Sequence, residues 1–138
     1  MNNNPLTETQ ARAYSPLALA FIGDAVYETF IRTKILLKAN TSAHKLHKAA
    51  VSYVRASAQS DAIKELAPLL TTEEEDIFKR GRNAHSASVP KNADVTEYRA
   101  ATGFEALLGY LHLSGQTQRL DFLMEEAYNI IGSKLSEK

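Results

Sequence analysis

Apolar residues recur with helical spacing along most of the chain, and turn-forming residues separate them into segments. The first segment begins at Ser15-Pro16, where serine suits the N-cap and proline the first helical residue. It continues to about Ala39, a length of about 36 Å at 1.5 Å per residue. Its apolar side chains cover nearly all sides, with Phe21 on one side and Val26 on another. A helix with this pattern is buried by other helices or by a second subunit.

A second helix is predicted from Thr41 or Ser42 to about Leu66, before Pro68. Its apolar and basic residues fall on opposite sides at 3.6 residues per turn. The apolar side carries Leu46, Ala49, Ala50, Tyr53 and Val54, and the basic side carries Lys45, Lys48 and Arg55.

Three shorter helices are predicted after Pro68. Thr72 and Glu75 have the spacing of a capping box, and Gly115 suits a helix C-terminus. The predicted elements are short turns near 67–71, a helix from Thr72 to about Gly81, a loop over 82–93, a helix from Asp94 or Thr96 to Ser114-Gly115, and a helix from about Thr117 to Lys134.

The pattern predicts an all-α protein of about five to seven helices. No clear alternating strand, hairpin dipeptide, repeat or linker is visible. The 138 residues, 44% of them apolar, are enough for one domain with a substantial core. We therefore expect a single domain over residues 1–138, with 1–10 as a flexible tail.

Composition narrows the class of protein further. The chain has no cysteine, which excludes disulfides and thiolate metal sites and fits a reducing compartment. No apolar run reaches the roughly 18 residues of a membrane span. The N-terminal residues lack the basic start and apolar stretch of a secretion signal. The expectation is a cytoplasmic protein without a membrane partner.

Charge is balanced overall but segregated along the chain. The net charge is zero, yet the segment from Thr29 to Ser60 contains six basic residues and no acid. An acidic run at 73–76 is followed by the basic run Lys79-Arg80-Gly81-Arg82. Such segregation permits a polyanionic ligand, although solvated helix faces have the same pattern.

Two carboxylates stand next to glycine in apolar helical segments. Asp24 follows Gly23, and Glu105 precedes Gly109 by one turn. Glycine costs a helix about 1 kcal/mol, and a buried carboxylate needs a partner or a metal. Phosphate-binding loops, zinc-protease motifs and nucleophile elbows are absent. The residues alone therefore leave two interpretations, a hard divalent cation between the acids or structural acids in ion pairs.

These two segments resemble the paired motifs of the ribonuclease III catalytic domain. Residues 21–26, Phe-Ile-Gly-Asp-Ala-Val, resemble the first motif, and residues 105–109, Glu-Ala-Leu-Leu-Gly, resemble the second. The short chain and Arg80-Gly81-Arg82-Asn83-Ala84 are similar to the Mini-ribonuclease III branch. The resemblance implies a homodimeric, Mg²⁺-dependent endonuclease for double-stranded RNA that matures precursor 23S ribosomal RNA. It also implies that Asp24 and Glu105 are the catalytic, metal-binding acids.

The chain departs from the family pattern at two positions. Full-length relatives carry an acid four residues before the motif aspartate and another three residues before the motif glutamate. Those positions are Ala20 and Thr102 here, on the same helix faces as the acids. We infer that water replaces the lost ligands and that the metal binds more weakly. Glu28, one turn after Asp24, is a further acid without a family counterpart.

The resemblance also guides the expected RNA contacts and partners. Duplex RNA is read mainly through its shape and phosphates, which calls for basic side chains. An assisting ribosomal protein on the substrate is a partner that the resemblance leaves open. A ribonuclease III-like RNA-binding module without cleavage and a helical interaction domain are the alternatives. The predicted RNA contacts are Lys79, Arg80, Arg82, His85 and Lys91, with Lys45, Lys48 and Arg55 as a weaker second patch.

Overall fold

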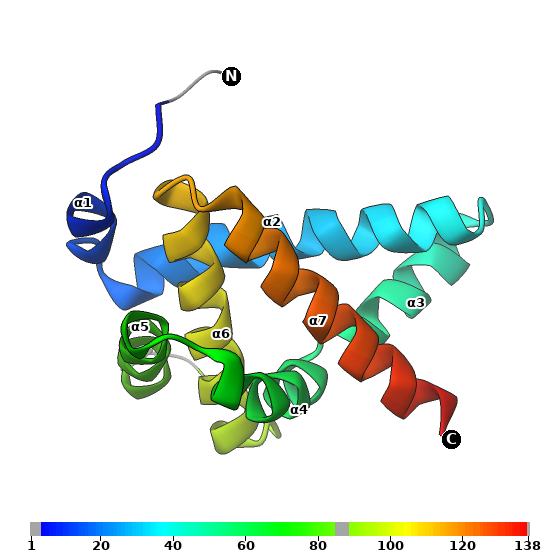
Figure 1. The fold of residues 1–138 in the computed structure, drawn as a ribbon. Helices are drawn as coiled ribbons and strands as arrows, with labels where there is room; N and C mark the ends of the chain where they lie inside the picture. Colours follow the sequence, from blue (N-terminus) through cyan, green and yellow to red (C-terminus); the bar gives the residue numbers. More distant parts are fainter. Residues whose placement is uncertain (1–3, 85–88, 138) are drawn as a thin grey trace.

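The computed structural model describes residues 4–84 and 89–137, and within these ranges it consists of helices joined by short connections, without strands (Figure 1). This confirms the prediction of an all-α protein. No helix in the described ranges combines the length and apolar character that crossing a membrane requires. The helices are α1 (Glu8–Arg12), α2 (Pro16–Lys38), α3 (Ala43–Val54), α4 (Ala56–Leu66), the 3₁₀ turn η1 (Ala67–Leu69), α5 (Thr72–Asn83), α6 (Val95–Leu113) and α7 (Thr117–Ser136).

Helix α6 forms the centre of the molecule. It packs against α2, α4, α5 and α7, and a continuous run from Ala106 to Leu111 is buried. In Figure 1 the long α2 crosses α6, and α5 and α4 lie to either side of the lower part of α6. Helix α2 is not covered on all sides by the chain, because Phe21 near its start and Leu37 near its end are each 82% exposed. The expected all-round burial of α2 is thus not achieved within one chain.

The helix predicted from Ser42 to Leu66 is wrong as a single element. The chain is extended at Arg55, with φ −60° and ψ 153°, and this residue ends α3 and begins α4. Neither proline nor glycine marks the break in the sequence. Helix α3 packs on α2, whereas α4 packs on α6 and α7, so the break allows the two halves to cover different partners.

The predicted capping box of α5 is shifted by one residue. The Oγ1 of Thr71 accepts the Glu74 N–H at 3.1 Å, and Glu74 Oε1 accepts the Thr71 N–H at 2.9 Å. The prediction had paired Thr72 with Glu75 instead. Two threonines and three glutamates in a row allow either register. Packing selects the first, since it buries Glu74.

Helix α1 was not predicted and ties the N-terminal segment to the core. Thr7 and Gln10 form its capping box. The Leu6 N–H donates to the Leu113 carbonyl at 2.8 Å, and Ala11 is fully buried. Residues 8–10, expected to belong to a flexible tail, are therefore the first turn of a packed helix.

Candidate active site

Glycines allow the backbones of α2 and α6 to touch where they cross. A Cβ atom on Gly23 would lie 1.8 Å from the Glu105 carbonyl oxygen, and one on Gly109 would lie 1.9 Å from the Leu19 carbonyl oxygen. Any larger residue at either position would overlap with the other backbone. The contact is reciprocal, since each helix contributes one glycine. The glycine next to each acid is therefore explained by close packing of two helices.

This crossing brings Asp24 and Glu105 together from opposite ends of the chain. Asp24 follows Gly23 directly, and the carbonyl group of Glu105 lies against Gly23. The carboxyl groups of Asp24 and Glu105 are close enough to hydrogen-bond when one is protonated. Asp24 is exposed on the surface of the chain, while Glu105 is largely covered. We call these two side chains the acid pair.

The carboxyl group of Glu105 is strongly perturbed. Its pKa is raised to about 8, with burial as the largest cause and the negative charge of Asp24 as the next. A hydrogen bond from Gln59 acts in the opposite direction and lowers the pKa. Glu28 adds a smaller repulsion. Two acids in this relation need a proton or a cation between them, because like charges at close range disfavour ionisation of both.

Gln59 is the polar partner of the acid pair that the sequence interpretation missed. Its Nε2 donates to Glu105 Oε2 at 3.2 Å, from a side chain that is 2% exposed. The neighbouring positions Ala58, Ala62 and Ile63 are buried as well. The sequence therefore offered one signal for this residue, a polar glutamine among apolar, buried positions of a predicted helix.

The two positions where relatives carry further acids, Ala20 and Thr102, supply no carboxylate here. Ala20 is buried at 7% exposure, and the Thr102 hydroxyl donates to the Tyr98 carbonyl at 3.0 Å. Glu28 is paired with Arg32 at 2.9 Å. Across the described ranges, no group of three or more His, Cys, Asp or Glu side chains is arranged to hold a metal ion. Asp24 and Glu105 therefore stand as a pair.

The donor set of the acid pair fits a hard divalent cation. Both potential ligands are carboxylate oxygens, which Mg²⁺ prefers, and Mg²⁺ commonly keeps several waters when one or two carboxylates bind it. A cation between the carboxylates would replace the proton that their mutual repulsion otherwise retains. This is the chemistry that the geometry permits.

The basic end of α5 packs on α6 at Gly103, two residues before Glu105 in the chain. A Cβ atom on Gly81 would lie 2.9 Å from the Cα of Gly103, so α5 packs closely on α6 there. Arg80 Nη1 donates to the Arg12 carbonyl at 3.3 Å, and the Arg82 guanidinium lies 5.7 Å from the centre of the Phe78 ring. The two arginines thus flank the packed glycine.

The other predicted RNA contacts are dispersed. Lys79 is paired with Glu75 at 2.7 Å on the exposed side of α5. Lys91 is exposed in the segment between α5 and α6, and His85 lies outside the described residues. Lys45, Lys48 and Arg55 are exposed on α3 and at its end. The structure therefore separates this second patch from the basic end of α5, as two different helices carry them.

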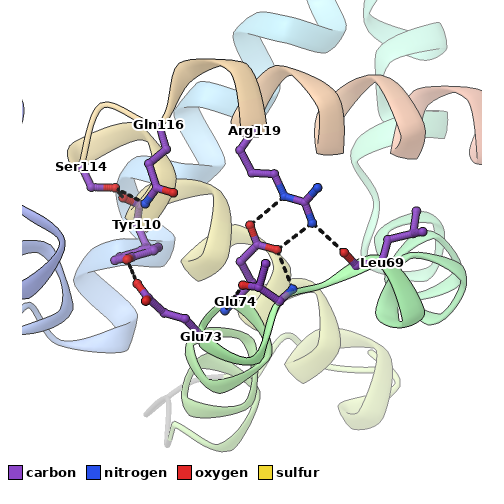
Figure 2. Close-up of polar contacts among 8 residues, drawn as sticks. Leu69, Glu73, Glu74, Tyr110, Ser114, Gln116 and Arg119 are labelled. Carbon is purple, nitrogen blue, oxygen red and sulfur yellow. Dashed lines mark hydrogen bonds and ion pairs between the residues drawn. The ribbon is translucent and has the colours of Figure 1, made fainter.

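A polar network on the far end of α6 holds three helices together (Figure 2). Arg119 of α7 donates to both carboxylate oxygens of Glu74 on α5, each at 2.8 Å, and to the Leu69 carbonyl at 2.6 Å. Tyr110 of α6 donates to Glu73. Burial would raise the pKa of Glu74, but the bonds from Arg119 and Thr71 outweigh it and lower the pKa. Both carboxylates in this network, Glu73 and Glu74, accept hydrogen bonds from a neighbouring helix, which indicates a structural role.

Comparisons with known proteins agree with the two motifs. The family described as "Ribonuclease III domain" matches residues 17–116. The chain is 49% identical over 130 residues to a Mini-ribonuclease 3 from Thermoanaerobacter sp. (strain X514), covering 94% of this chain and 92% of that one. A Mini-ribonuclease 3 from Symbiobacterium thermophilum is 45% identical, with 93% and 94% covered. A crystal structure of a protein from Fusobacterium nucleatum superposes with a TM-score of 0.76 at 31% identity, covering 86% of this chain and 94% of that one.

Proposed function

The chain belongs to the ribonuclease III family and is an endoribonuclease of that type, and we propose that it cleaves double-stranded RNA with Mg²⁺ held by Asp24 and Glu105. The observation that carries this proposal is the convergence of the two acids at the glycine crossing of α2 and α6. The substrate that we propose is precursor 23S ribosomal RNA, in the cytoplasm. A ribosomal protein on that RNA is the partner most compatible with this assignment.

The residues of the chain have separate tasks in the proposed reaction. Asp24, exposed at the surface, presents a carboxylate toward solvent and the incoming phosphate. Glu105, largely covered, holds the second ligand oxygen in a fixed place. When bound, Mg²⁺ lowers the pKa of a coordinated water and offsets the charge that develops on the phosphate. No side-chain nucleophile is required.

The basic end of α5 is the proposed path for the RNA backbone. Double-stranded RNA is bound through its phosphates and shape, which guanidinium groups match well. Arg80 and Arg82 flank Gly81, which packs against Gly103, two residues before Glu105 in the chain. Lys79, Lys91 and His85 extend this path, and Lys45, Lys48 and Arg55 form a second contact patch.

A two-fold dimer is proposed on the uncovered face of α2. Phe21 is 82% exposed and Leu17 is 39% exposed, and both lie within two turns of Asp24. Large exposed apolar side chains on one face indicate a partner surface. A two-fold axis near this face presents two acid pairs to the two strands of one duplex.

The decisive test removes each carboxylate charge without changing its size. Asp24→Asn and Glu105→Gln are expected to fold and to bind duplex RNA, but to lose Mg²⁺-dependent cleavage by about 100-fold or more. Cleavage of a long RNA duplex is measured with and without Mg²⁺, and RNA binding is measured without Mg²⁺. Asp76→Asn, an exposed acid on α5, is the matched control and should cleave normally. Full activity in either acid variant would disprove the metal assignment.

A further inference from the structure

Gln59 on α4 is a buried amide with an unusual division of hydrogen bonds. Its Nε2 donates to the Val54 carbonyl at 2.8 Å and to Glu105 Oε2 at 3.2 Å, so both N–H groups are used. Its Oε1 is buried and has no hydrogen-bond partner among the described residues. An unpaired buried acceptor costs free energy, so such a group calls for an explanation. The explanation lies in the two N–H groups of the same amide. Both point at acceptors, and this orientation leaves Oε1 unpaired.

The break between α3 and α4 fixes which end of the amide faces Glu105. In a continuous helix a backbone N–H would reach the Val54 carbonyl, but the chain is extended at Arg55. The Gln59 side chain takes that place. A carbonyl only accepts, so the nitrogen of the amide must face Val54, and the same nitrogen then faces Glu105. The helix break therefore presents a donor to the carboxylate.

We propose that Gln59 is a positioning residue of the acid pair: its amide anchors Oε2 of Glu105 and thereby reserves the other carboxylate oxygen for the cation shared with Asp24. This inference rests on the proposed function of the acid pair. When both acids are ionised, Gln59 is the only side-chain hydrogen-bond donor to Glu105 among the described residues. The orientation of the carboxylate is thus set by one amide.

The orientation of the Glu105 carboxylate is important because the acid pair offers only two carboxylate ligands. Ala20 and Thr102 supply no carboxylate, so one of only two ligands depends on Gln59. Mg²⁺ demands nearly ideal octahedral geometry, which leaves little tolerance for a rotated carboxylate. Loss of a hydrogen-bond partner behind a metal ligand typically weakens metal binding by about 10- to 100-fold.

Ser60 provides a matched control for Gln59. It is the next residue on α4, is 1% exposed, and has an Oγ without a hydrogen-bond partner among the described residues. Ser60→Ala therefore changes a buried polar group on the same helix without touching Glu105. Gln59→Met keeps an unbranched side chain of similar length and removes both donors. Thermal unfolding of both variants reports the structural cost separately.

The first experiment measures Mg²⁺ binding to the metal-free full chain by titration calorimetry, without RNA. Gln59→Met is expected to bind Mg²⁺ about 10-fold more weakly than the unsubstituted protein. Ser60→Ala is expected to bind as the unsubstituted protein does. Unchanged affinity in a folded Gln59→Met variant, or an equal loss in Ser60→Ala, would overturn the proposal.

The second experiment needs no substitution at Gln59. The side-chain amide signals of Gln59 are followed by NMR during a Mg²⁺ titration of the unsubstituted protein, and they should shift in step with saturation. Signals that stay fixed while Mg²⁺ saturates the site would also overturn the proposal. Failure of the proposed function is distinguishable, because Asp24→Asn and Glu105→Gln would then bind Mg²⁺ normally. Failure of the Gln59 inference alone leaves those two variants deficient.

Discussion

At the scale of single residues, Glu105 links the stability of the protein to pH. Its pKa of about 8 in the folded chain lies above the ordinary value of 4.5, mainly because it is buried. Between these two pH values the folded state keeps a proton that the unfolded chain has lost. The free energy of unfolding of the metal-free protein therefore falls as pH rises, by up to about 1.4 kcal/mol per pH unit from this group.

Glu105→Gln should remove this contribution to the pH dependence. Urea unfolding in the presence of a chelator is measured at about pH 5 and about pH 8 for both proteins. The difference in stability between variant and unsubstituted protein should shift in favour of the variant at the higher pH. Asp76→Asn serves as the control for a surface acid. A constant difference across this range would contradict the raised pKa.

At the scale of elements, the crossing of α2 and α6 depends on two glycines. Gly23→Ala or Gly109→Ala places a Cβ atom within 2 Å of the opposite backbone, at 1.8 Å and 1.9 Å respectively. Neither backbone can move without separating the helices, so each change should cost about 3 kcal/mol or more. Gly132→Ala meets only the side chain of Tyr53, whose hydroxyl lies at 3.3 Å, and should change stability by about 1 kcal/mol or less. Urea unfolding compares the three variants, and an equal effect in all three would contradict the crossing.

The joint between α5 and α7 depends on the pair of Glu74 and Arg119. Arg119→Leu leaves a carboxylate of 4% exposure without its main partner and should destabilise the protein by about 3 kcal/mol. Glu74→Leu combined with Arg119→Leu should recover much of that loss, apart from the capping bond to Thr71. A double-mutant cycle from unfolding curves measures the coupling. Additive losses would show that the two residues act independently.

At the scale of the whole molecule, the proposed dimer depends on the exposed face of α2. Phe21→Glu introduces a charge at a position of that face that is 82% exposed and should give a monomer in sedimentation at micromolar concentration. The exposed Leu37 at the other end of α2 offers a matched control, and Leu37→Glu should remain dimeric. A monomeric unsubstituted protein under the same conditions would contradict the dimer.

The proposed RNA path also belongs to the whole molecule. Neutralising Arg80 and Arg82 together should weaken duplex binding and reduce the slope of log affinity against log salt by about 2, since each phosphate contact contributes about 1. Lys64→Gln, an exposed lysine on α4, should leave the slope unchanged. Binding is measured without Mg²⁺ at several salt concentrations. An unchanged slope in the arginine variant places the RNA elsewhere.

The sequence by itself determined the all-helical class, the long first helix and the two segments that carry the acids. These features are local, since periodic apolar residues, Ser15 with Pro16, and Gly115 specify helices and their ends within a few residues. It also placed a glycine near each acid. It left open whether the space beside that glycine, which has no side chain, is filled by another helix, a metal or a ligand.

Only the tertiary structure decided what that space is for. Gly23 and Gly109 accept the opposite backbone, which is a contact between segments far apart in the chain. The same holds for the break at Arg55, the register of the Thr71 cap and the place of Gln59 beside Glu105. None of these has a local cause, because each satisfies a partner on another helix. Periodicity therefore specified the helices, and packing between them assembled the acid pair.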